Sequence, residues 1–201
     1  MTFAFICVYL RPLLRGWRYH KYLESVTLAG SHAKGTDLRD SDFDIFLRLS
    51  PDTPGSLAAM QASLADRVLG HVRNVSVRIM LDGRFIDLVP GRGNILWQAR
   101  YNTWLKTDFA AQIRYVRSSG LIDEILALKI WRRRHALRFP SFLMELATIH
   151  ARPKDFRALL HFLATDFPTT RLLDPANSNN VVSDLLTEVE KLRISRTAAG
   201  W

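Results

Sequence analysis

The chain has 201 residues, of which 48% are hydrophobic and 23% are charged, so its composition excludes a disordered or low-complexity protein. This length can bury one core, or a core together with a smaller lobe, but hardly two fully independent domains. An excess of 28 Lys and Arg over 19 Asp and Glu gives a formal charge of +9. That charge favours a polyanionic partner, either a nucleoside triphosphate or RNA, without choosing between them.

The longest apolar run near the start, residues 3–10, contains the only cysteine of the chain, Cys7. The run is too short to span a bilayer and follows no basic segment of a secretory signal, so we interpret it as core and expect no membrane partner. A single cysteine allows neither an intrachain disulfide nor a cysteine-based zinc site. A reducing cytoplasm is therefore the expected compartment.

Hydrophobic periodicity predicts helices and strands alternating over the first half of the chain. Asp82-Gly83 lies between two of the strands and is a favoured two-residue hairpin turn. In chain order, the expected elements are a helix over residues 1–20, strands over 26–28 and 43–49, a helix over 54–70, and strands over 75–80 and 84–89.

After residues 90–94 the pattern becomes helical, and it predicts no further strand of comparable strength. Ser141 follows Pro140 and is the expected N-cap of one of these helices. The helices are expected over residues 108–118, 121–136, 141–151 and 156–167. The predicted fold class is α+β: a domain over residues 1–107 with a mixed sheet flanked by helices, and a helical domain over residues 108–201.

Three acids stand out in the strand-rich half. Side chains alternate along a strand, so Asp42 and Asp44 should point to the same face and could hold one divalent cation between them. Asp87 is a lone charge in the apolar run 85–90, which a neighbouring strand could bring close to the other two. Carboxylates of this kind suit two Mg²⁺ ions.

The turn Gly30-Ser31, the segment Ser41-Asp42-Phe43-Asp44-Ile45 and the later Asp87 together resemble the catalytic core of the DNA polymerase β-like nucleotidyltransferase superfamily. Residues 126–131 and 139–146 are similar to the helical lobe of archaeal-type CCA-adding enzymes, oligoadenylate synthetases and bacterial cyclic-dinucleotide synthase-like enzymes. The resemblance covers about residues 22–180. It implies a mixed-sheet palm domain and a helical lobe with a cleft between them.

The resemblance also implies roles for individual residues. Gly30 and Ser31 would hold the β and γ phosphates of an incoming nucleotide, and Lys129 and Ser141 would meet the triphosphate from the helical lobe. The three acids would be both catalytic and metal-binding, with Mg²⁺ or Mn²⁺ as the cofactor: Asp42 and Asp44 would bind both ions, and Asp87 one of them.

The implied reaction is attack of a 2′- or 3′-hydroxyl of a nucleotide on the α phosphate of a nucleoside triphosphate, with ATP as the expected donor and oligonucleotides or cyclic nucleotides as products. Two other acceptors stay open within the enzymes: the 3′ end of an RNA and a protein side chain. A third alternative is an inactive protein that binds nucleic acid. Residues 132–135 form a basic run, which we interpret as a solvated helix end.

Overall fold

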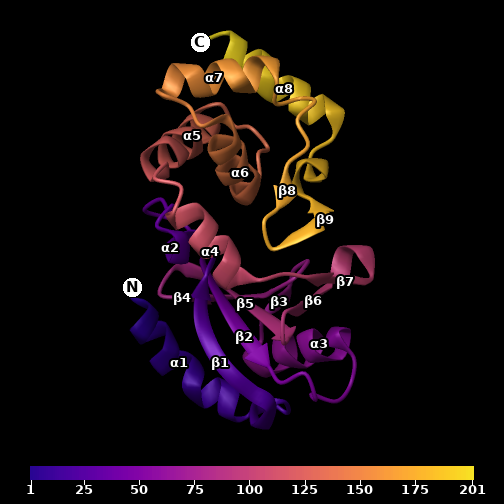
Figure 1. The fold of residues 1–201 in the computed structure, drawn as a ribbon. Helices are drawn as coiled ribbons and strands as arrows, with labels where there is room; N and C mark the ends of the chain where they lie inside the picture. Colours follow the sequence, from indigo (N-terminus) through magenta and orange to yellow (C-terminus); the bar gives the residue numbers. More distant parts are fainter. The chain divides into compact units, whose positions relative to one another are not determined.

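The computed structural model describes residues 1–201, which form two compact units (Figure 1). The sheet unit comprises residues 1–33 and 40–108, and the helical unit comprises residues 34–39 and 109–201. The segment 34–39 lies in sequence between two strands of the sheet unit, yet its contacts belong to the helical unit. Each unit has a hydrophobic cluster of its own.

The sheet unit is built around a mixed, seven-stranded sheet. Its strand order is β1-β2-β5-β4-β3. In addition, β6 pairs with the C-terminal end of β5, and β7 pairs with β6. Only β2 and β5 pair in parallel, and the other neighbours are antiparallel. The strands are β1 (Leu23–Ala29), β2 (Phe43–Leu49), β3 (His71–Val72), β4 (Val77–Leu81), β5 (Arg84–Arg92), β6 (Ile95–Gln98) and β7 (Thr103–Lys106).

Helices cover this sheet with their apolar sides. The α1 helix (Phe3–Arg15) buries Ile6, Leu10 and Leu14 in the same cluster as Ile45 and Leu47 of β2. The unit also contains the 3₁₀ turns η1 (His20–Tyr22) and η2 (Ala99–Tyr101), α2 (Gly30–Lys34), whose last residue belongs to the helical unit, and α3 (Leu57–Val68).

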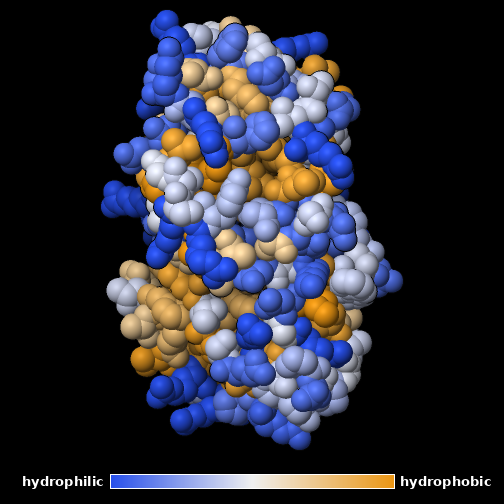
Figure 2. Space-filling view, viewed as in Figure 1, coloured by the Kyte–Doolittle hydropathy of each residue, from blue (hydrophilic) through white to orange (hydrophobic).

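The outer side of α1 differs from the sequence-based expectation. Val8 is 73% exposed, and Phe5 and Tyr9 are also exposed, so the run 3–10 is core on one side only. Figure 2 shows apolar side chains at the surface over this helix. None of the helices combines the length and apolar character needed to cross a membrane.

The predicted hairpin is present, with Asp82 and Gly83 at φ values of 48° and 71° between β4 and β5. The sequence predicts no further strand of comparable strength after residues 90–94, and it missed β6 and β7, which pair with each other directly after β5. Their strands are only four residues long and are joined by a 3₁₀ turn without a two-residue turn signal.

The helical unit contains the four helices that the sequence predicts. It also contains a short hairpin and a final helix that were not predicted. Ser141 is the first residue of its helix, and the N-cap position belongs to Pro140, so the prediction of Ser141 as N-cap was wrong. The elements are α4 (Phe109–Arg117), α5 (Ile122–Arg134), α6 (Ser141–Ala151), α7 (Phe156–Thr165), β8 (Leu173–Asp174), β9 (Asn177–Val181), η3 (Val182–Leu185) and α8 (Glu188–Ala199).

Candidate functional site

Three acidic side chains converge on one face of the sheet. Asp44 of β2 and Asp87 of β5 are direct partners in the parallel register, and partners in register point to the same side of a sheet. Asp42 lies one residue before β2, two positions from Asp44 in the alternation. The structure therefore brings together the three acids that the sequence singles out.

Arg78 of β4 joins two of these acids. Its Nη2 atom donates to Oδ2 of Asp42 and to Oδ2 of Asp87, both at 2.6 Å, and its Nε atom donates to Oδ1 of Asp87 at 3.1 Å. The hydrogen bond to Asp87 and the charges of both acids raise the pKa of Arg78 despite partial burial. One cationic group, here the Arg78 guanidinium, can therefore bind the carboxylates of Asp42 and Asp87 at the same time.

Asp87 is the most enclosed of the three acids, with 8% of its surface exposed. The Oγ atom of Ser76 donates a further hydrogen bond to its Oδ1 atom at 3.2 Å. A nearly buried carboxylate needs such partners, because an unpaired buried charge is strongly destabilising.

The donor set at this face fits a hard divalent cation, since carboxylate oxygens are the ligands that Mg²⁺ prefers. No group of three His, Cys, Asp or Glu side chains is prearranged as a metal site. The Arg78 guanidinium binds carboxylate oxygens of both Asp42 and Asp87. A metal ion would have to take over these oxygens.

The Gly30-Ser31 turn lies against the acidic strand. Gly30 has a φ of +60° and opens α2, directly after Ala29, which pairs with Asp44. A Cβ atom at position 30 would collide with the Asp44 carboxylate. Two constraints therefore favour glycine at position 30: the left-handed backbone conformation and the close approach of the Asp44 carboxylate.

The residues between the turn and the acids are also ordered by contacts within the sheet unit. The ring of His32 stacks on Phe43, with centroids 3.9 Å apart, and its Nε2 atom lies 3.2 Å from the carbonyl oxygen of Ser41. Arg84 donates to the same carbonyl at 3.1 Å. These contacts hold the start of β2 beside α2.

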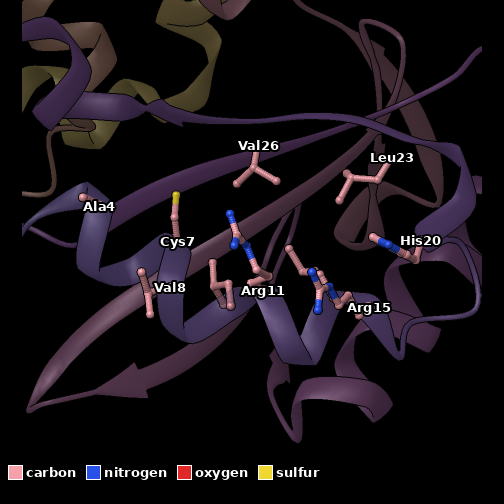
Figure 3. A pocket seen from close by; sticks show the side chains of 10 residues that line it. Ala4, Cys7, Val8, Arg11, Arg15, His20, Leu23 and Val26 are labelled. Atoms are coloured by element: carbon pink, nitrogen blue, oxygen red, sulfur yellow. The ribbon is translucent and has the colours of Figure 1, made fainter.

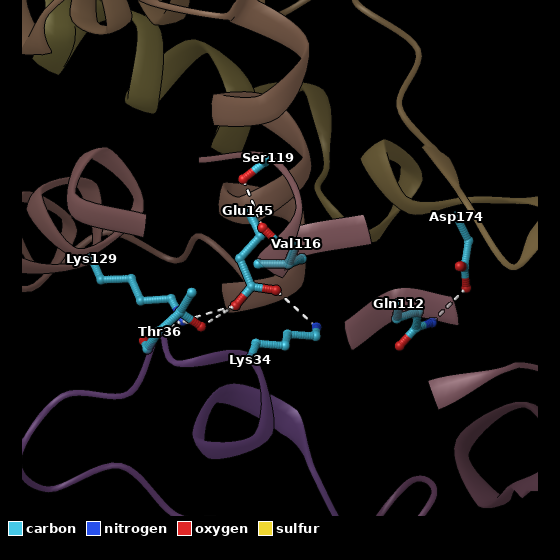
Figure 4. Close-up of polar contacts among 8 residues, drawn as sticks. All are labelled: Lys34, Thr36, Gln112, Val116, Ser119, Lys129, Glu145 and Asp174. Carbon is cyan, nitrogen blue, oxygen red and sulfur yellow. Dashed lines mark hydrogen bonds and ion pairs between the residues drawn. The ribbon is translucent and has the colours of Figure 1, made fainter. Parts of the chain in front are cut away.

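Lys129 lies in a buried network within the helical unit (Figure 4). Its Nζ atom donates to Oε1 of Glu145 at 2.9 Å and to the carbonyl oxygen of Thr36 at 2.8 Å. Lys34 donates to Oε2 of Glu145 at 2.8 Å, and the Thr36 hydroxyl donates to Oε1 at 2.7 Å. Glu145 thereby links the segment 34–39 to α5 and α6.

For both Glu145 and Lys129, burial and the opposite charges of the neighbours shift the pKa in opposite directions. Burial alone disfavours the charged form of Glu145, but the ammonium groups of Lys34 and Lys129 outweigh it, so the pKa of Glu145 is lowered. For Lys129, burial outweighs the attraction of Glu145, and its pKa is lowered as well. Glu145 is thus held as a carboxylate with its oxygens shared between two lysines.

Sequence reasoning missed Arg78, Lys34 and Glu145. Arg78 stands between Val77 and Ile79, both buried, so an arginine alternating with core residues in a strand was an available signal. Glu145 similarly stands in a run of buried residues in α6. Ser141 is exposed, and its predicted contact with a triphosphate stays a prediction, as does that of Lys129.

A hollow of about 730 Å³ lies beside α1, where Cys7 and Arg11 point toward Val26 of β1 (Figure 3). No acidic side chain lines it, and its basic lining residues are Arg11, Arg15 and His20. It offers no carboxylate to bind Mg²⁺, so the acid cluster is the better candidate site.

Comparison with protein families gives a match of residues 13–130 to the family described as nucleotidyltransferase domain. The matched region contains the Gly30-Ser31 turn and all three acids of the cluster. No curated protein matches the sequence significantly.

Solved structures of similar fold include three bacterial proteins, each of which covers 98% of this chain. CdnC of E. coli MS115-1, solved with ATP, has a TM-score of 0.74 and 21% identity, over 82% of its own chain. CdnG of Bradyrhizobium diazoefficiens, solved with GTP, has a TM-score of 0.77 and 11% identity, over 82% of its chain. The cyclic dinucleotide synthase CdnE of Elizabethkingia meningoseptica, solved with GTP and Apcpp, has a TM-score of 0.74 and 13% identity, over 90%.

Proposed function

The chain belongs to the nucleotidyltransferase domain family, and from this premise we propose that it transfers a nucleoside monophosphate from a nucleoside triphosphate to a nucleotide hydroxyl. The proposed products are oligonucleotides or cyclic nucleotides, and the proposed cofactor is Mg²⁺ or Mn²⁺. The observation that carries the proposal is the convergence of Asp42, Asp44 and Asp87 on one face, with Gly30 packed against Asp44.

The proposed site divides the chemistry among these residues. Asp42, Asp44 and Asp87 would hold two divalent ions, which supply charge neutralisation for the triphosphate and lower the pKa of the attacking hydroxyl. The Asp87 carboxylate can accept the hydroxyl proton. The hydroxyl oxygen then bonds to the α phosphorus while the bond to the bridging oxygen breaks, and pyrophosphate leaves.

Triphosphate binding is proposed for Gly30 and Ser31, because backbone amides after a glycine can approach phosphate oxygens closely. Lys129 and Ser141 are proposed as further triphosphate contacts on the family resemblance. CdnC and CdnG were solved with ATP and GTP respectively, which supports a nucleoside triphosphate as substrate. We propose ATP as the first donor to test.

The test is incubation of the purified protein with each α-labelled nucleoside triphosphate and Mg²⁺ or Mn²⁺, with and without single-stranded RNA. We expect soluble labelled oligonucleotides or cyclic products and release of pyrophosphate. Label on the RNA would show transfer to an RNA end, and label on protein would show transfer to a side chain.

Asp42→Asn and Asp44→Asn should each abolish product while leaving the melting temperature close to that of the wild type. The matched control is Asp66→Asn, which changes an exposed acid in the last turn of α3 and should keep full activity. Turnover by the Asp44→Asn variant, or no product with any triphosphate and metal, would overturn the proposed function.

A further inference from the structure

The hairpin formed by β6 and β7 has two faces of very different character. Leu96 is 2% exposed and pairs with Leu105, so this face belongs to the core. On the opposite face, Trp97 pairs with Trp104, which is 62% exposed, and Ile95 pairs with Lys106. A solvent-facing side of a hairpin is usually polar, and here it carries two indole rings.

Directly opposed residues of an antiparallel pair have Cβ atoms about 4.5–5.5 Å apart. Trp97, which is half-buried, and Trp104, which is exposed, therefore lie next to each other on this face. Tyr101, at the tip of the hairpin, is 55% exposed and adds a third ring. We call these three residues the aromatic face of the hairpin.

The hairpin tip is held in place before any ligand arrives. The backbone N–H of Ala99 donates to the carbonyl oxygen of Asn74 at 2.7 Å, and that of Arg100 donates to the Asn74 side chain at 3.0 Å. The Arg100 guanidinium lies 5.7 Å from the centre of the Tyr101 ring. A preorganised surface loses little conformational entropy on binding.

The hairpin and the residues directly before it carry charge of one sign in the sequence. From Leu88 to Thr107 the chain has no Asp or Glu, while Arg92, Arg100 and Lys106 are positive. Exposed aromatic rings beside cations match a ligand with planar rings on an anionic backbone.

We propose that the aromatic face binds single-stranded oligonucleotide, with bases stacked on Trp104, Trp97 and Tyr101 and phosphates near Arg100. The identification of such a strand as the acceptor or the growing product rests on the proposed function, whereas the binding itself does not. A membrane is the weaker occupant, because the tip that would enter it carries Arg100, Asn102 and Thr103.

The test measures binding of fluorescein-labelled 15-mers of uridylate, adenylate and thymidylate by fluorescence anisotropy, without triphosphate or divalent metal. Wild type should bind, and Trp104→Ala should bind about tenfold or more weakly, since one base stack is worth that much. Trp104→Phe should keep most of the affinity, and Trp104→Leu should lose it. An apolar docking surface for protein or lipid would tolerate leucine.

Two matched controls separate the aromatic face from general effects. Tyr9→Ala removes a half-exposed ring from α1 in the same unit and should leave the affinity unchanged. Arg100→Gln should reduce the slope of log affinity against log salt by about 0.7. Arg18→Gln should not, although Arg18 also lies over a tyrosine, with its guanidinium carbon 5.0 Å from the Tyr19 ring centre.

The binding assay separates failure of this inference from failure of the proposed function. Asp44→Asn should bind the 15-mers as wild type does, even though it makes no product. Absence of binding at low salt, equal binding by Trp104→Ala, or binding to anionic phosphatidylserine vesicles in place of oligonucleotide would each overturn the inference.

Discussion

Single residues at the candidate site serve more than one requirement at once. Gly30 adopts a left-handed backbone and also faces the Asp44 carboxylate without a Cβ atom between them. Arg78 neutralises Asp42 and Asp87, which would otherwise repel each other. Each position can therefore be tested by a single substitution.

We expect Gly30→Ala to abolish nucleotidyl transfer and to lower the free energy of unfolding by more than the roughly 1–2 kcal/mol of left-handed strain. The excess arises because the new Cβ atom forces the Asp44 carboxylate to move. Urea denaturation and the product assay measure both effects. Gly83→Ala is the control, since it has a φ of +71° but no neighbour within 4 Å, and it should show the strain alone. Equal losses in the two variants would argue against the close approach.

Removal of the Arg78 guanidinium should make stability depend on the divalent cation. Arg78→Gln leaves Asp42 and Asp87 without their shared counter-charge, so the melting temperature without metal should fall. Added Mg²⁺ should recover more of the melting temperature in this variant than it adds to wild type, because binding to the folded state stabilises it. A thermal shift series with EDTA and Mg²⁺ tests this. The same Mg²⁺ response in both proteins would contradict it.

Whole elements differ in how well local pattern predicts them. The β2 strand was predicted at its observed bounds, residues 43–49, because its apolar side chains and its end at Ser50-Pro51 are local signals. The β6 and β7 strands were missed because neither is long enough to show a clear alternation, and their pairing with β5 and each other stabilises them.

The buried network at Glu145 connects α5 and α6 to the segment 34–39, and its loss should be costly. We expect Glu145→Gln to reduce the free energy of unfolding by about 3–5 kcal/mol, because it leaves the ammonium groups of Lys34 and Lys129 buried without a counter-charge. The control is Glu24→Gln, which breaks an exposed pair with Arg48 and should change stability by less than about 1 kcal/mol. Chemical denaturation compares the two.

The same network predicts a pH dependence of stability. The folded-state pKa of Glu145 is lowered from 4.5, so the unfolded chain binds its proton at a higher pH than the folded chain does. The contribution of Glu145 is therefore fully present above about pH 5 and is lost as the pH falls through 4.5 and below. Wild type should lose stability over this range more steeply than Glu145→Gln, as measured by melting temperature from pH 3 to 7.

At the scale of the whole molecule, the chain divides into two units, each with its own core. The expectation of a core with a smaller lobe understated the helical unit, whose cluster is as extensive as that of the sheet unit. Its core draws on residues 128–198, where α8 and the segment between α7 and α8 add apolar side chains that periodicity did not single out.

We expect heat unfolding to show two calorimetric transitions rather than one. Leu163→Ala in the helical unit and Leu47→Ala in the sheet unit are both fully buried leucine truncations. Each should cost its own unit about 2–5 kcal/mol and lower a different transition. A single transition that both variants lower equally would show that the units unfold together.

The sequence alone determined that Asp42 and Asp44 point to one face at the start of a strand, with the Gly-Ser turn before them. Strand periodicity and turn chemistry suffice for this, because both act between near neighbours. It also supported the superfamily that the family match confirms. Only the tertiary structure decided that Arg78 lies between Asp42 and Asp87, and that Glu145 binds Lys34. These partners are 36 positions apart for Arg78 and Asp42, and 111 for Glu145 and Lys34. Local pattern carries no information across such distances, since packing of the whole chain selects which remote groups meet.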